Sequence, residues 1–143
     1  MVLNNSPASA CFHWNHRTIA SGETLRVVVV DDNKNTADAV SAALAQEGYE
    51  SLPVYSGAQA IKSCDMFRPH AMLLDISMPH CDGFATAREI RATKGESKLL
   101  ILAYTALPRE FVVMRAAPGD FDGFCQKGAP IENVVRCLRE VST

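Results

Sequence analysis

Three short apolar runs constrain the fold of this chain more than any other feature of its sequence. They are LRVVVV at 25–30, AMLLDI at 71–76 and KLLILAYT at 98–105. A strand with one face in water alternates apolar and polar residues, and these runs do not. Each run is therefore expected to be a strand buried on both faces, which is typical of a parallel sheet with helices above and below it.

Helices and two weaker strands fill the intervals between these runs. The helical spacing that follows the first run ends at Gly48. SLPV at 51–54 is a short strand, and its Pro53 favours an edge position. FDGFCQ at 121–126 is the last strand, and Pro130 then opens a final helix. Strands that alternate with helices in this way predict an α/β fold, a doubly wound five-stranded parallel sheet with helices on both faces.

The composition bounds the domain count and the class of partner. The chain has 143 residues, 48% of them hydrophobic, which suits one domain with a real core. Its net charge of −2 argues against a broad nucleic-acid-binding face. The five cysteines form no C-x-x-C pair, which favours reduced thiols in a cytoplasmic protein.

The amino-terminal segment differs from the rest of the chain. Residues 1–24 are polar, lack any apolar period and contain no signal-peptide core, and no run in the chain is long enough to span a bilayer. We expect a flexible extension or linker at 1–24, followed by one domain at 25–143, and no association with a membrane.

Chemically distinctive side chains come at the ends of the expected strands. Asp31 and Asp32 follow the first run, Asp75 ends the second, Thr105 ends the third, and Lys127 follows the last strand. In a parallel sheet these ends meet at one edge. Three carboxylates together require a cation, and oxygen ligands suit Mg²⁺, while a hydroxyl and an ammonium suit a phosphoryl group. Each residue alone is commonly a turn, a cap or a solvated charge, so the joint pattern carries the hypothesis.

At these positions the chain resembles a known family. The motifs are VVVVDDN, LLDISMPHCDG, ILAYTA and FDGFCQKG, and the likeness runs from about residue 25 to residue 141. Within these motifs Thr105 lies 105 − 75 = 30 residues beyond Asp75, and Lys127 lies 127 − 75 = 52 residues beyond it. Both intervals are close to those of the family. Together the motifs resemble the response-regulator receiver domains, the CheY-like modules of two-component signalling. The resemblance implies a flavodoxin-like sheet with the strand order 2-1-3-4-5.

The resemblance also implies the chemistry of the acidic residues. Asp75 would be the phosphoacceptor, phosphorylated by a histidine kinase or a histidine phosphotransfer protein. Asp32, Asp75 and the backbone carbonyl of Ser77 would bind Mg²⁺, with Asp31 acting largely through water. Such a module is a signalling domain and not an enzyme.

The remaining motif residues would form the switch. Thr105 would bond the phosphoryl group, Lys127 would pair first with Asp75 and then with the phosphate, and Phe124 would turn inward as Thr105 moves. The output would be a changed surface on the fourth helix, fifth strand and fifth helix. That surface would control an unidentified protein partner, and a phosphorylation-dependent homodimer is compatible with it.

Two features depart from the family pattern. Gly128 follows Lys127 where the family usually has proline, so we expect a trans peptide bond there and a loop that glycine's freedom still allows. Ser77 and Leu107 occupy positions that tune dephosphorylation in the family, and neither carries an acid or an amide. The hypothesis that follows is slow self-dephosphorylation.

Alternative interpretations remain open at this point. The chain would be a stand-alone receiver or the receiver module of a larger hybrid histidine kinase, and Gly128 weakly favours a non-phosphorylated pseudo-receiver that acts as a scaffold. A phosphatase would require a second acid where Ser77 stands. A flavin- or nucleotide-binding protein would require a Ser/Thr/Gly-rich phosphate loop where the acidic DDNKNT stands.

Overall fold

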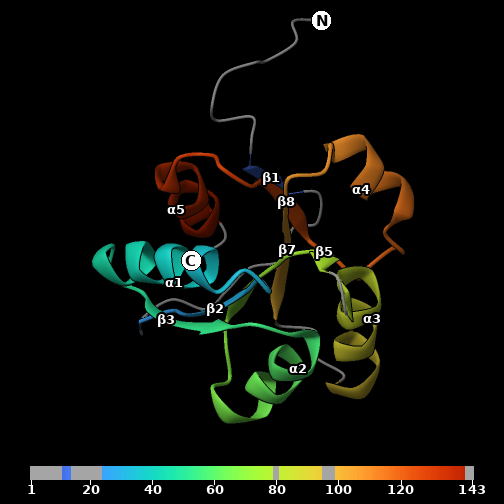
Figure 1. Cartoon of the computed structure of the whole chain (residues 1–143), viewed down its shortest axis with the longest axis horizontal. Coiled ribbons are helices and arrows are strands. Elements are labelled where there is room, and N and C mark those ends of the chain that lie inside the picture. The colour runs from blue at the N-terminus through green and yellow to red at the C-terminus, as the bar shows by residue number, and fades with distance from the viewer. Residues whose placement is uncertain (1–10, 14–23, 79–80, 95–98, 141–143) are drawn as a thin grey trace, which may run out of the picture.

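The structure is a central sheet with helices on both faces (Figure 1). It is a computed structural model that describes residues 11–13, 24–78, 81–94 and 99–140. The sheet order is β1-β8-β7-β4-β2-β3. Its strands are β1 Cys11–His13, β2 Arg26–Val30, β3 Glu50–Val54, β4 Ala71–Leu74, β7 Leu100–Thr105 and β8 Gly123–Gln126. The helices are α1 Lys34–Gln46, α2 Gly57–Met66, α3 Gly83–Lys94, α4 Arg109–Arg115 and α5 Ile131–Glu140.

Five of these strands run parallel, in the order β3-β2-β4-β7-β8. In chain order that is 2-1-3-4-5, so the predicted sheet is confirmed. Two apolar clusters lie on opposite faces of it. One contains side chains of α1 and α5, and the other contains side chains of α2, α3 and α4. All four residues of β4 are buried, as are the four valines of β2, which explains why these strands show no alternation.

Local sequence signals set several element boundaries. Ser56 caps α2 by accepting a hydrogen bond from the Gln59 N–H, and the Gln59 side chain accepts one from the Tyr55 N–H. Gly48, with φ of +98°, lies just beyond α1 in the left-handed region that glycine adopts without strain. Pro53 lies in β3, which is an edge strand as expected.

One strand was not expected from the sequence. Residues 11–13 pair antiparallel with β8, and Cys11 lies opposite Cys125. The segment is three residues long within a polar region, too short to show a period, so pattern analysis had no signal to detect. The rest of the expected extension, 1–10 and 14–23, lies outside the described residues, as does 141–143 at the end of the last helix.

A buried ion pair ties α3 to the amino ends of β7 and β8. The Arg91 guanidinium lies 2.8 Å from the Asp122 carboxylate and also donates to the Leu99 and Gly119 carbonyls. The same Asp122 oxygen accepts a hydrogen bond from the Ile101 N–H at 2.9 Å. Asp122 is fully buried, and a buried carboxylate is stable in a fold only when it is paired and hydrogen-bonded as this one is.

The substitution Asp122→Ala is expected to lower the free energy of unfolding by about 3–5 kcal/mol, because it leaves the partly buried Arg91 guanidinium without its counter-charge and the buried Ile101 N–H without its acceptor. Urea denaturation measures the loss. Arg88→Ala is the matched control, since Arg88 is mostly exposed and lies 3.6 Å from Asp120; it should cost under about 1 kcal/mol. Equal losses for the two variants would contradict the assignment.

Candidate functional site

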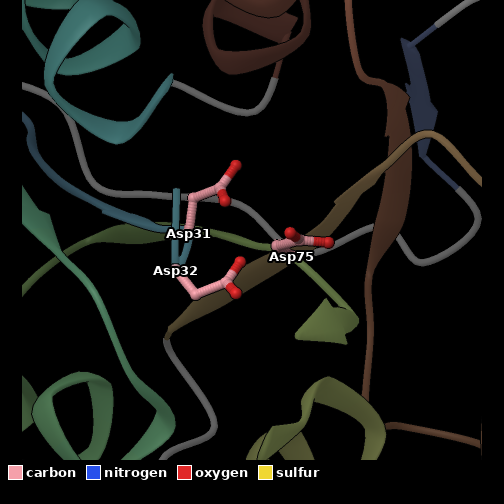
Figure 2. A group of neighbouring side chains, drawn as sticks. All are labelled: Asp31, Asp32 and Asp75. Carbon is pink, nitrogen blue, oxygen red and sulfur yellow. The ribbon is translucent and has the colours of Figure 1, made fainter. Parts of the chain in front are cut away.

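Three carboxylates meet at the carboxyl edge of the sheet. Val30 of β2 pairs with Leu74 of β4, so the residues that follow them, Asp31 and Asp75, leave the sheet side by side. Asp32 comes next along the chain. Oxygens of the three carboxylates lie within 4.8 Å of one another, and Figure 2 shows them gathered at the ends of their strands. The structure thus brings together the three acids that the sequence placed at this edge.

Backbone N–H groups orient the two buried acids. Asp31 Oδ1 accepts a hydrogen bond of 2.9 Å from the Asn33 N–H, and Asp75 Oδ1 accepts one of 3.0 Å from the Ser77 N–H. Asp32 is exposed. The site therefore has two fixed carboxylates and one that faces solvent, which leaves a side open for a ligand to enter.

Lys127 bridges the two buried acids. Its Nζ lies 2.6 Å from Asp31 Oδ2 and 2.9 Å from Asp75 Oδ2. The pairing with Asp75 matches the expectation, whereas the pairing with Asp31 was not expected. One ammonium thus faces three carboxyl groups, and a divalent cation would supply further positive charge to such a cluster of oxygen ligands.

Burial and neighbouring charges shift the pKa of both partners. Burial raises the pKa of the Asp75 carboxyl. The Ser77 N–H and Lys127 act against this rise, but the pKa still lies above its ordinary value. Burial lowers the pKa of Lys127, but the hydrogen bonds and charges of Asp75 and Asp31 outweigh it and leave the pKa raised. Lys127 therefore remains an ammonium at neutral pH.

Thr105 lies at the end of β7, next to the strand that leads to the lysine. Its carbonyl accepts a hydrogen bond of 2.8 Å from the Lys127 N–H. Its hydroxyl oxygen accepts one of 3.2 Å from the Leu107 N–H, which leaves the hydroxyl proton available to a further acceptor. Gln126 donates to the carbonyls of Thr105 and Ala106, a contact that no motif in the sequence indicates.

Phe124 and Gly128 flank the lysine on β8 and on the loop after it. Phe124 is only 2% exposed and packs in the apolar cluster with α3 and α4, so the aromatic ring is already turned inward here. Gly128 has φ of +90°, and no cis peptide bond occurs among the described residues. Glycine's freedom at that angle allows the loop to carry Lys127 toward Asp75 without the usual proline.

Comparison with known proteins identifies the family. Residues 27–139 match the family model described as response regulator receiver domain. The chain belongs to that family. Response regulator MprA of Mycobacterium ulcerans is 28% identical over 118 residues, which are 81% of this chain and 49% of that protein. MprA of Mycobacterium avium is 28% identical over 117 residues, 80% of this chain and 50% of that protein. The receiver chain thus spans about half the length of these curated relatives.

Solved structures agree with the receiver fold. Chemotaxis protein CheY4 of Vibrio cholerae has a TM-score of 0.75 at 25% identity, over 83% of this chain and 99% of that one. Response regulator TrrA of Thermotoga maritima, solved in complex with Mg²⁺-BeF, has a TM-score of 0.72 at 25% identity, over 82% and 99%. No described helix of this receiver has the length and apolar character to cross a membrane.

Gly83 is a site residue whose role emerges only from the structure. After Asp75 the chain forms a short hairpin, β5 Ser77–Met78 with β6 Cys81–Asp82, and returns to the start of α3. A Cβ atom on Gly83 would lie 2.3 Å from the Ile76 Cα and 2.5 Å from the Asp75 carbonyl oxygen. Only glycine allows this approach. The Asp82-Gly83 pair was visible in the motif, but not the contact that requires it.

The substitution Gly83→Ala is expected to displace the Asp75–Ile76 backbone and to lower the free energy of unfolding by about 1–3 kcal/mol. Urea denaturation measures the stability, and amide shifts of Asp75 and Ser77 in NMR spectra report the displacement. Gly119→Ala is the control, because no atom lies within 4 Å of its Cβ position and only its φ of +88° opposes alanine. Unchanged amide shifts at Asp75 would refute the contact.

Proposed function

We propose that this receiver is a phosphoacceptor whose Asp75 takes a phosphoryl group from a histidine kinase or a histidine phosphotransfer protein. The observation that carries the proposal is the position of Asp75. It is buried among two other carboxylates, and its Oδ2 lies 2.9 Å from the Lys127 ammonium. A nucleophilic carboxylate needs positive charge nearby for the oxygens of the incoming group, and Lys127 supplies part of it.

The donor set fits Mg²⁺ as the remaining positive charge. Oxygen ligands from Asp31, Asp32 and Asp75 are the type that this ion prefers, and three acids offer more negative charge than the single positive charge of Lys127 balances. Asp32 and Asp75 would hold the ion with the Ser77 carbonyl, and Asp31 would act through water. Bound there, Mg²⁺ would neutralise phosphoryl oxygens. TrrA, solved with Mg²⁺-BeF, supports this assignment by similarity.

The transfer step is a displacement at phosphorus. An Asp75 oxygen attacks the phosphorus of a phosphohistidine, the P–N bond breaks, and the electron pair stays on the imidazole nitrogen, which takes up a proton. Lys127 then shifts its hydrogen bond from the carboxylate to a phosphoryl oxygen. The Thr105 hydroxyl donates to another, since its proton is available.

The output would follow from a change around β8. The Lys127 N–H donates to the Thr105 carbonyl. A phosphoryl group that accepts hydrogen bonds from both side chains would therefore pull on β7 and β8 together. Phe124 on β8, whose ring is buried in this structure, would belong to the switch and hold the inward arrangement. A ligand that favours one arrangement shifts the population toward it, and the surface of α4, β8 and α5 would then control a protein partner or a homodimer. We propose a cytoplasmic location and no direct contact with nucleic acid or membrane.

The kind of protein in which this receiver works has two alternatives. The chain spans about half the length of the curated response regulators it matches. It would act either as a stand-alone receiver or as the receiver module of a larger hybrid histidine kinase. A non-phosphorylated pseudo-receiver is the alternative function, which the intact Asp75–Lys127 pair disfavours.

Intact mass after incubation with acetyl phosphate tests the proposal. We expect one added phosphoryl group on the wild type, dependent on Mg²⁺, and none on Asp75→Asn. Asp65→Asn is the matched control, since Asp65 is an exposed acid of α2 outside the three-carboxylate site. Beryllofluoride binding follows if no adduct forms. Binding would indicate a receiver that needs its own donor, and no binding would leave the pseudo-receiver.

The phosphoryl group, once attached, is expected to persist for minutes or longer. Ser77 and Leu107 offer no carboxylate or amide to orient an attacking water. Release of inorganic phosphate from the purified phosphorylated protein, at neutral pH with Mg²⁺, measures its lifetime. Loss within seconds would contradict the hypothesis of slow self-dephosphorylation.

A further inference from the structure

The added strand β1 lies against the strand that leads to the lysine. Without it, β8 would be the open edge of the sheet, paired only with β7. With it, residues 123–125 are paired on both sides, to β7 at Leu102–Tyr104 and to residues 11–13. A strand with partners on both sides is held more firmly than an edge strand, because displacing it must break two ladders.

Two contacts anchor β1 in addition to its strand pairing. Cys11 is 1% exposed and belongs to the apolar cluster under α1 and α5, together with Cys125 and Leu138. Its carbonyl accepts a hydrogen bond of 2.9 Å from Arg136 Nη2 of α5. Arg136 also pairs with Glu140 one turn later. Burial of Cys11 and the bond from Arg136 thus fasten β1 to α5 as well as to β8.

The path from β1 to the site is short and runs along β8. Residue 125 of β8 pairs with Cys11, Gln126 bonds the carbonyls of Thr105 and Ala106, and the next residue is Lys127. The Lys127 N–H bonds the Thr105 carbonyl, and its ammonium contacts Asp75. Whatever fixes β8 therefore fixes both groups that would meet the phosphoryl oxygens.

We propose that β1 is a positioning element of the phosphoryl site, fastened by Arg136, which holds β8 so that Lys127 and Thr105 are preorganised around Asp75. The proposal rests on the function proposed above for Asp75. Preorganisation tightens binding because the cost of ordering these groups has already been met before the ligand arrives. Coupling is reciprocal, so the bound phosphoryl group also strengthens the docking of β1. Arg136 contacts no reacting atom and acts through β1 and β8.

The test measures the affinity for beryllofluoride with Mg²⁺ in the full chain, by ¹⁹F NMR titration. Arg136→Met removes the bond to the Cys11 carbonyl, and Glu140→Gln is its matched control because it removes only the charge of the second partner of Arg136. Cys11→Asp places a carboxylate in the buried position opposite Cys125, and Cys11→Ser is its near-isosteric control. Far-UV circular dichroism verifies that each variant folds.

Hydrogen exchange of the backbone amides of residues 11–13 supplies a second measurement, because these residues pair with β8. Reciprocal coupling predicts a change to slower exchange there when Mg²⁺ and beryllofluoride bind the wild type. Asp75→Asn should abolish the change. A merely structural role of β1 would lower stability in the variants without producing this response.

We expect the dissociation constant for beryllofluoride to rise by about fivefold or more in Arg136→Met and Cys11→Asp, and to stay within about twofold in the controls. Folded variants that bind as tightly as the wild type would overturn the role of β1 and leave the proposed function standing. A wild type that binds no beryllofluoride would overturn both. Should Cys11→Asp not fold, Arg136→Met decides alone.

Discussion

The contact between Lys127 and the two buried acids is the interaction on which the site depends. Two carboxylates enclosed at the end of a sheet repel each other, and a buried negative charge without a partner is strongly destabilising. Lys127 lies within 2.6 Å of one and 2.9 Å of the other. The lysine can do this only because β8 ends beside β7, and because Gly128 adopts a positive φ directly after it. The register of the sheet and the freedom of the loop are thus both needed to place the positive charge of Lys127 between the two acids.

The parallel sheet with helices on both faces could be predicted because each strong strand is buried on both faces, whereas the order of the strands followed from the resemblance to receiver domains. Unbroken runs such as the valines of β2 fit no amphipathic element, so helices had to cover the sheet above and below. The site residues followed from the same logic, since parallel strands deliver their carboxyl ends to one edge. Asp31, Asp75 and Lys127 are brought together as expected. The metal, the transfer step and the inward turn of Phe124 as a response remain predictions.

Contacts that depend on the distances of the folded chain could not be predicted from the sequence. Gly83 is required because the hairpin after Asp75 brings two backbone segments together, and no side-chain periodicity encodes that approach. Gln126 resembles any polar residue at a strand end until its amide is seen on two carbonyls. The pairing of Lys127 with Asp31 likewise depends on a distance of the fold, not on a spacing along the chain. β1 was missed because three residues cannot show a period.

The place of β1 also has a consequence for the order in which the chain acquires its structure. Its partners include residues 123–125 and Arg136, and Cys11 and Arg136 lie 125 residues apart in the sequence. On a ribosome, residues 11–13 emerge first, but they can dock only after β8 and α5 have been synthesised. Contacts between such distant residues also carry a large loop-closure entropy and form late in folding. β1 is therefore synthesised before the strand and the helix on which it docks, and it can take its place only after them.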